Sequence, residues 1–116
     1  MLTSPLVKQY VIDELRPDDY KKLKAHLDKN FNSSDIDGIY WIPLDQENLT
    51  DIQAGHNECQ PFYFVIELNP DILACELLVR TKSRVRCDCI SYATEKQLSW
   101  LIRFLDGMLD KLEIIT

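Results

Sequence analysis

The sequence predicts an α+β fold, in which a single mixed or antiparallel sheet of about five strands carries two main helices on one face. Three observations support this prediction. Between Pro61 and Ala93 the chain alternates apolar and polar residues and is rich in β-branched and aromatic types, as in consecutive strands. Pro17–Asn30 and the segment from Thr94 onward instead carry apolar residues at helical spacing. Strands and helices do not alternate strictly, so one sheet covered by helices is the simplest packing.

A strand, a helix and a second strand are predicted in the first part of the chain. Tyr10–Leu15 is a β-rich run that stops at Arg16-Pro17. Proline suits the first turn of a helix, because the N–H that it lacks would have no hydrogen-bond partner there. The helix should cover Pro17–Asn30, and Ile39–Ile42 should form the second strand because β-branched and aromatic residues dominate it. The apolar stripe of the helix consists of Tyr20, Leu23, Leu27 and Phe31.

A short helix is expected over Asp45–Ala54. Asp45 is a suitable N-cap, and Gly55 can adopt the left-handed conformation that often ends a helix. The residues expected to face inward are Leu49 and Ile52.

Three antiparallel strands should follow, at Phe62–Leu68, Ile72–Thr81 and Val85–Tyr92. If Thr81 pairs with Val85, the apolar sides of the strands coincide. The predicted core face consists of Phe62, Phe64, Ile66, Leu73, Cys75, Leu77, Val79, Val85, Cys87 and Cys89. The other face carries Tyr63, Val65, Glu67, Glu76, Leu78, Arg80, Arg86, Asp88, Ile90 and Tyr92.

The last helix begins with a capping box, in which Thr94 and Gln97 can each satisfy a backbone donor of the first turn. The predicted order is therefore β-α-β-(short α)-β-β-β-α within one domain, residues 1–116, with the places of the first two strands in the sheet undetermined. The core stripe of this helix consists of Leu98, Leu101, Ile102, Leu105, Leu109 and Leu112.

Composition narrows the functional classes. Hydrophobic residues make up 46% and charged residues 28% of the 116 residues, which is typical of a folded, water-soluble domain. The net charge of −6 opposes binding to nucleic acid or an anionic membrane, because such binding draws on Lys and Arg. The N-terminus has no apolar run of signal-peptide length, so we expect a cytoplasmic protein. The four cysteines lack the dense spacing of a disulfide scaffold, so we expect free thiols.

One imidazole and three thiols form a possible zinc ligand set: His56, Cys59, Cys87 and Cys89. The second pair falls within a predicted strand, where alternate residues lie about 6.5–7 Å apart. Both thiols would reach one ion only if the His56–Cys59 loop folded over the sheet. We therefore favour buried core thiols for Cys75, Cys87 and Cys89, with zinc as the alternative. In a further alternative, His56 and Cys59 form a reactive thiol–imidazole pair.

Two surface features also suggest binding. Arg80, Lys82, Arg84 and Arg86 cluster at a predicted hairpin. The three arginines form a candidate anion site, although charges there also serve to keep strand edges soluble. On the last helix, Trp100, Phe104 and Gly107 form a second stripe away from the leucines. Aromatic residues are enriched at interface centres, so this stripe is a candidate partner surface unless the first helix or the N-terminal arm covers it.

The function predicted from the sequence is that of a small acidic cytoplasmic domain that binds a protein partner or a ligand. It is expected to be non-enzymatic, to need no cofactor, and to self-associate as a homodimer through the last helix. The alternative is a zinc or reactive-thiol site built from His56, Cys59, Cys87 and Cys89.

Overall fold

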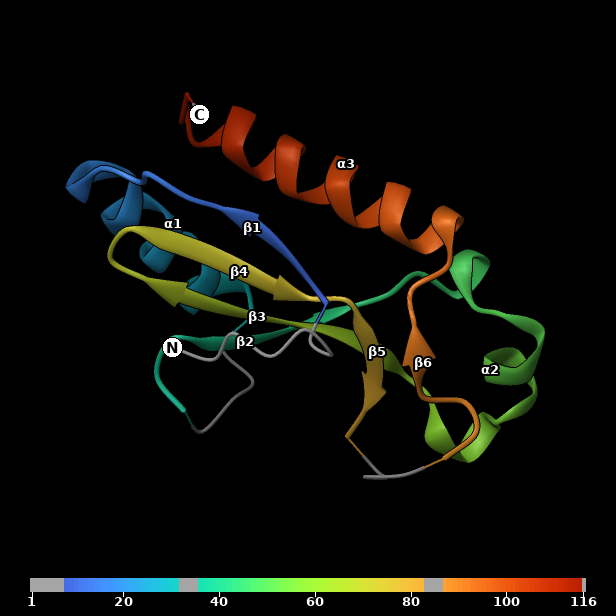
Figure 1. The fold of residues 1–116 in the computed structure, drawn as a ribbon. Helices are drawn as coiled ribbons and strands as arrows, with labels where there is room; N and C mark the ends of the chain where they lie inside the picture. The colour runs from blue at the N-terminus through green and yellow to red at the C-terminus, as the bar shows by residue number, and fades with distance from the viewer. Residues whose placement is uncertain (1–7, 32–35, 83–86, 116) are drawn as a thin grey trace.

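The structure is a computed structural model that describes residues 8–31, 36–82 and 87–115. It contains an antiparallel sheet with helix α3 laid across one of its faces (Figure 1). The predicted α+β class is therefore confirmed. The strands are β1 (Gln9–Ile12), β2 (Ile39–Pro43), β3 (Phe62–Asn69), β4 (Ile72–Glu76), β5 (Leu78–Thr81) and β6 (Ser91–Tyr92). The helices are α1 (Pro17–Asn30), α2 (Asp51–Gly55) and α3 (Glu95–Lys111), with 3₁₀ turns η1 (Gln46–Asn48) and η2 (Asn57–Cys59).

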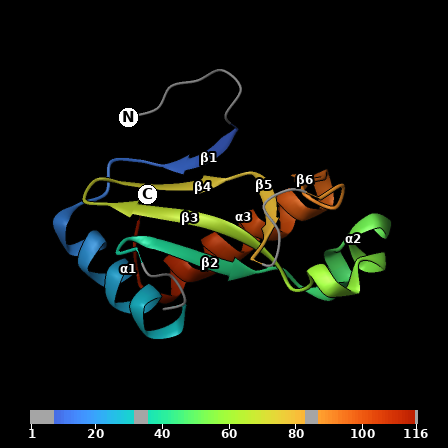
Figure 2. The ribbon, with the colours of Figure 1, turned by 90° about the horizontal axis from the view of Figure 1, so that it is seen from below.

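Strand β3 is the centre of the sheet. It pairs with β2 on one side and with both β4 and β5 on the other. Strand β1 extends the sheet beyond β4, and β6 extends it beyond β5, with every pair antiparallel. Figure 2 shows β1, β4, β3 and β2 side by side in this order, with α3 behind them. The two first strands thus occupy opposite edges of the sheet.

A break at Leu77 divides the strand that the sequence predicts over Ile72–Thr81. Ile66 pairs with Cys75 and Phe62 pairs with Thr81, so four steps along β3 face six steps along the opposite chain. The two extra residues form an irregular bend of the β-bulge kind. The Leu77 N–H donates to the carbonyl of Lys8, and its carbonyl accepts from the N–H of Ala93. The break therefore lets β1 and β6 share one edge.

The predicted strand over Val85–Tyr92 is wrong in its described part. Only Ser91 and Tyr92 are extended, and Tyr92 pairs with Leu78, where the expected register would have placed Asp88. Residues 87–90 instead make a tight turn, in which the Ile90 N–H donates to the Cys87 carbonyl over 3.0 Å. Because this hydrogen bond is made within the turn, Cys87 and Cys89 do not pair with β5. Val85 lies outside the described residues.

Helix α1 spans Pro17–Asn30, as predicted. Its start is fixed by Asp19, whose carboxylate accepts hydrogen bonds from the backbone and the guanidinium of Arg16. These bonds lower the pKa of Asp19. Its other end is tied to the sheet, because the Tyr40 hydroxyl of β2 donates to Asp28 over 2.5 Å. Burial and this carboxylate raise the pKa of Tyr40 to about 12.

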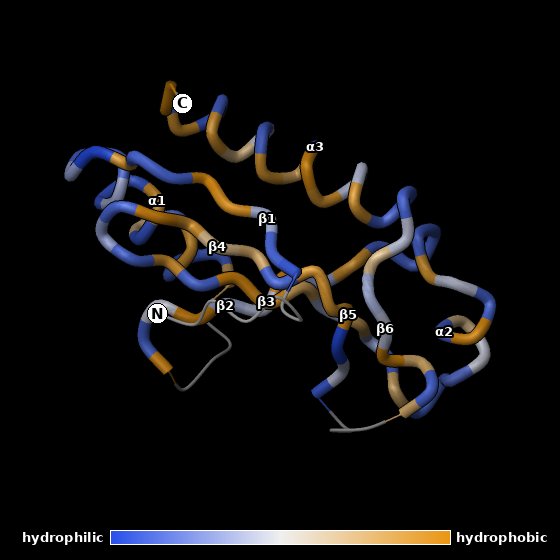
Figure 3. The backbone as a smooth tube through the Cα atoms, viewed as in Figure 1, coloured by the Kyte–Doolittle hydropathy of each residue, from blue (hydrophilic) through white to orange (hydrophobic). Residues whose placement is uncertain are grey.

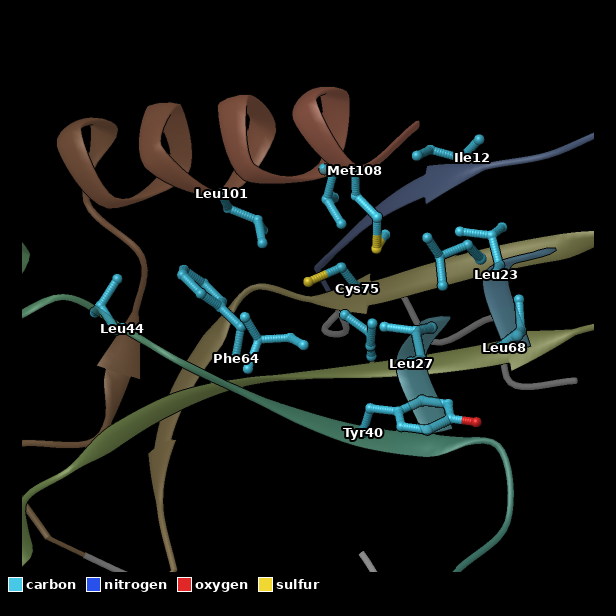
Figure 4. Close-up of a cluster of buried hydrophobic side chains, with 14 of the residues drawn as sticks. Ile12, Leu23, Leu27, Tyr40, Leu44, Phe64, Leu68, Cys75, Leu101 and Met108 are labelled. Carbon is cyan, nitrogen blue, oxygen red and sulfur yellow. The ribbon is translucent and has the colours of Figure 1, made fainter. Parts of the chain in front are cut away.

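Both main helices cover the same face of the sheet. Leu101 of α3 points toward Phe64 and Met108 toward Cys75, and Leu23 and Leu27 of α1 reach the same cluster (Figure 4). Apolar positions recur along α3, β3 and β4 (Figure 3). This arrangement confirms the prediction of two helices on one face. The predicted core-face residues that are buried are Phe62, Phe64, Ile66, Leu73, Cys75, Val79 and Cys89.

Helix α3 begins as predicted, with Thr94 and Gln97 bonded in a capping box. The short helix differs from its prediction, because α2 begins after Thr50, which forms the same kind of box with Gln53. Asp45 precedes the separate turn η1, and its carboxylate accepts from the Trp100 indole N–H. Ile52 is 54% exposed, contrary to the prediction, and Gly55 does not adopt a left-handed conformation.

Within the described ranges, none of the helices combines the length and the apolar character needed to cross a lipid bilayer.

We expect Leu101→Ala to lower the free energy of unfolding by about 2–5 kcal/mol, because Leu101 is fully buried beneath α3 and its removal leaves a cavity. Ile52→Ala is the matched control and should change it by less than about 0.5 kcal/mol, since Ile52 is exposed. Urea unfolding followed by circular dichroism measures both. Equal losses in the two variants would contradict this core assignment.

Candidate metal centre

The structure brings together the four residues that the sequence singles out as a zinc ligand set. The ligand atoms of His56, Cys59, Cys87 and Cys89 all lie within 4.8 Å of one another. The His56 Nδ1 is 3.1 Å from the Cys87 Sγ, and the Sγ atoms of Cys59 and Cys87 are 3.9 Å apart. Cys59 and Cys89 are buried, whereas His56 and Cys87 are half-buried. One imidazole and three thiols therefore converge on one point.

These separations suit a tetrahedral ion. With Zn–S bonds of about 2.3 Å, tetrahedral geometry places two sulfur ligands about 3.8 Å apart. The Cys59–Cys87 distance of 3.9 Å matches this value. The largest separation in the group, 4.8 Å, is longer by about 1 Å, which rotation about a cysteine Cα–Cβ bond can remove.

Two turns present the ligands. His56 follows helix α2, and the 3₁₀ turn η2 brings Cys59 back beside it, with the Cys59 N–H donating to the His56 carbonyl over 3.0 Å. Cys87 and Cys89 lie in the turn that precedes β6. The strand geometry assumed in the sequence analysis would have kept these two sulfurs far apart. Because residues 87–90 turn instead, both thiols reach the same point as the His56–Cys59 loop.

Buried polar side chains hold the backbone of the ligands in place. The Gln53 amide donates to the Cys89 carbonyl over 3.1 Å, and the Thr81 hydroxyl of β5 donates to the Cys59 carbonyl. Gln97 of α3 in turn donates to the Gln53 side-chain oxygen over 2.9 Å. All three of these polar residues are buried. Gln53 and Thr81 were not among the predicted site residues, although Thr50-x-x-Gln53 repeats the capping-box pattern of Thr94 and Gln97.

The three clustered thiols are not equivalent. Hydrogen bonds from the Cys89 thiol and the Cys89 backbone N–H, with smaller contributions from Cys59 and His56, lower the pKa of Cys87 to about 7. Burial raises the pKa of the Cys89 thiol to about 12. The Cys87 thiol therefore loses its proton before that of Cys89 in the metal-free cluster. Cys75 lies apart from the cluster, within β4, and burial raises its pKa to about 12.

The cysteine assignments divide accordingly. Cys75 and Cys89 are buried, as the core-thiol interpretation predicts, but Cys87 is half-buried and Cys89 is within reach of the other ligand atoms. His56 lies close to Cys87 rather than forming the expected pair with Cys59. The finding therefore favours a joint site over separate core thiols.

The other predicted sites are not gathered in this way. Arg80 binds the Glu76 carboxylate over 2.6 Å, while Arg84 and Arg86 lie outside the described residues. The anion site thus stays a prediction.

The partner surface predicted on α3 is partly covered. The Trp100 ring stacks on Phe64 and Phe104, and Phe104 also contacts Phe31 edge-on. Gly107 is exposed on the same helix. Self-association through Trp100, Phe104 and Gly107 likewise stays a prediction.

Comparison of the chain with protein-family models, with curated proteins and with solved structures gave no match.

In metal-free protein we expect iodoacetamide at neutral pH to label Cys87 first, because it is half-buried and its pKa is lowered to about 7. Cys75 should stay unlabelled in the folded protein, because it is buried and protonated. Peptide mapping by mass spectrometry after timed quenching gives the order. Labelling of Cys75 as fast as Cys87 would contradict the structure, and urea-unfolded protein, in which both should react, is the control.

Proposed function

We propose that this chain is a non-enzymatic domain that binds one structural Zn²⁺ ion through His56, Cys59, Cys87 and Cys89. The observation that carries the proposal is the convergence of four ligand atoms within 4.8 Å of one another, drawn from two turns far apart in the sequence. Cysteines that serve only as core residues need no imidazole beside them. A shared ion accounts for all four side chains at once.

The chemistry of the ligands favours zinc. Thiolates and imidazole are the common ligands of tetrahedral zinc, whereas Ca²⁺ and Mg²⁺ prefer oxygen. The ligand set Cys₃His is one of the usual sets of structural zinc sites. Binding would deprotonate the thiols, and the lowered pKa of Cys87 makes the first of these steps easy near neutral pH.

A structural role fits better than a catalytic one. Catalytic zinc sites usually have three protein ligands and keep a fourth position for water or substrate. Here four side chains supply four ligand atoms, and two of the four residues are buried. An ion held by all four leaves no position for a substrate.

A reactive thiol is supported less well. His56 and Cys87 are close enough for a thiol–imidazole pair. A nucleophile of this kind needs a third group to orient the imidazole. Among the described residues, no side chain other than Cys87 has a recorded hydrogen bond with the His56 ring.

The ion would join two segments of the chain that are far apart in the sequence. His56 and Cys59 connect α2 to β3, and Cys87 and Cys89 lead into β6 and then α3. The helices α2 and α3 are long-range neighbours here, because Gln53 and Gln97 are hydrogen-bonded. Zinc would therefore cross-link two segments that otherwise depend on a few buried hydrogen bonds.

Protein purified without a metal-affinity tag should contain about one equivalent of zinc by elemental analysis. Cys59→Ser should lose most of it, because removal of one of four ligands opens the site. Cys75→Ser is the matched control and should keep its zinc, since Cys75 is buried outside the cluster.

Stability supplies a second measurement. Chelation should lower the free energy of unfolding, by about 4 kcal/mol where free zinc had exceeded its dissociation constant a thousandfold. Wild-type protein that takes up no zinc after reduction, and whose unfolding ignores added zinc, would refute the proposal.

We expect Gln53→Leu to weaken zinc binding by about 10–100-fold, because Gln53 holds the Cys89 carbonyl without touching the ion. Competition with a chromophoric chelator measures the affinity. Gln9→Leu, a change at an exposed glutamine of β1, should leave it unaltered. An unchanged affinity in folded Gln53→Leu protein would show that this support is not needed.

A further inference from the structure

A hollow lies between the end of α1 and the open face of the sheet, where β2 forms the edge. Its volume of about 460 Å³ is within the range of about 300–1,000 Å³ that is usual for ligand sites. We call it the aromatic–lysine hollow. It is lined chiefly by Lys29, Phe31, Trp41, Pro43, Tyr63 and Lys82.

The aromatic side chains of the hollow are arranged around a cation. Trp41 of β2 and Tyr63 of β3 meet edge to face, with ring centroids 5.6 Å apart. The Lys82 ammonium lies over both rings, 4.8 Å from the Tyr63 centroid and 5.5 Å from that of Trp41. Cation–π contacts of this kind hold the ammonium in place without neutralising it. The hollow therefore presents a positioned positive charge above an apolar floor.

The charge of the hollow is opposite to that of the chain. The protein carries a net charge of −6, yet the two charged side chains that line the hollow are both lysines, Lys29 and Lys82. Arg16, Lys24 and Arg80 each bind a carboxylate. Among the described residues, by contrast, no carboxylate forms an ion pair with Lys29 or Lys82. Two ammonium groups without a paired carboxylate in one hollow favour an anionic partner.

The edge of the sheet beside the hollow is open. Within the described ranges β2 pairs with β3 alone, so one side of its backbone faces away from the sheet. Gly38 and Leu44 direct their backbone bonds to β3. Because the direction alternates along a strand, the N–H and C=O of Trp41 point outward, where an added strand could pair with them. Figure 2 shows β2 as the outermost strand on the side of α1.

We propose that the aromatic–lysine hollow binds an extended peptide segment with carboxylate side chains. The segment would pair with the outer edge of β2 through the Trp41 backbone. Every second residue of the segment would face the open side of the sheet, where its carboxylate meets Lys82, with Lys29 adding to the attraction. This proposal is independent of the zinc site, because none of the four metal ligands lines the hollow.

The test uses an acetylated and amidated peptide that alternates valine and glutamate, titrated into the full chain by calorimetry. We expect saturable 1:1 binding that weakens as salt increases. The same peptide with glutamine in place of glutamate should bind at least tenfold more weakly. N-methylation of the central glutamate should weaken it similarly, because that residue lies opposite Trp41 on the open face and would then lack the N–H that donates to the Trp41 carbonyl.

Variants of the protein place the site. The double change Lys29→Glu and Lys82→Glu should reduce affinity for the glutamate peptide at least tenfold. The control is Lys21→Glu with Lys22→Glu, at exposed positions on α1, which should retain binding to within about threefold. Both proteins are compared after circular dichroism shows that each has the wild-type fold. Among the described residues none of these four lysines forms an ion pair, so the changes break no salt bridge of the fold.

Three results would overturn the proposal. The first is no binding of the glutamate peptide at millimolar concentration. The second is equal binding of the glutamate, glutamine and N-methylated peptides. The third is full displacement of the peptide by inorganic phosphate at constant ionic strength, which would indicate a simple anion site instead of strand addition.

Discussion

The arrangement of the ligand cluster depends on the hydrogen bond between the side chains of Gln53 and Gln97. Each glutamine closes the capping box of its own helix and is buried completely. A buried amide without partners is costly, so the two helices are held where both amides are satisfied. Gln97 also donates to the Asn48 carbonyl, and Gln53 to that of Cys89. One polar contact thus sets the position of α2, of α3 and of the cysteine turn.

The parts of the fold that rest on local patterns could be predicted from the sequence. The bounds of α1 and the start of α3 follow from proline, capping residues and apolar spacing. The alternation along β3 correctly assigns Phe62, Phe64 and Ile66 to the core. These features depend on residues that are close together in the chain, and such residues can be compared directly.

The candidate site could be predicted only in its residue types. The alternation of apolar residues around Cys87 and Cys89 is compatible with a strand, and nothing local shows that the bend at Leu77 shifts the pairing. Two residues of excess length on one side of the ladder are a property of the pairing and not of either strand. The predicted start of the short helix was wrong for a related reason. Asp45 and Thr50 are both acceptable N-caps, and contacts with the distant residues Gln97 and Trp100 decide between them.

The bend at Leu77 also has a consequence for how copies of this protein behave at high concentration. On that side the sheet boundary consists of two short strands, β1 and β6, which come from opposite ends of the chain and meet at a step. A neighbouring molecule would need the same irregular offset to continue the ladder across it. Short, stepped boundaries resist fibril-like stacking. The irregularity at Leu77 therefore disfavours strand addition at this edge of the sheet, in contrast to the regular edge formed by β2.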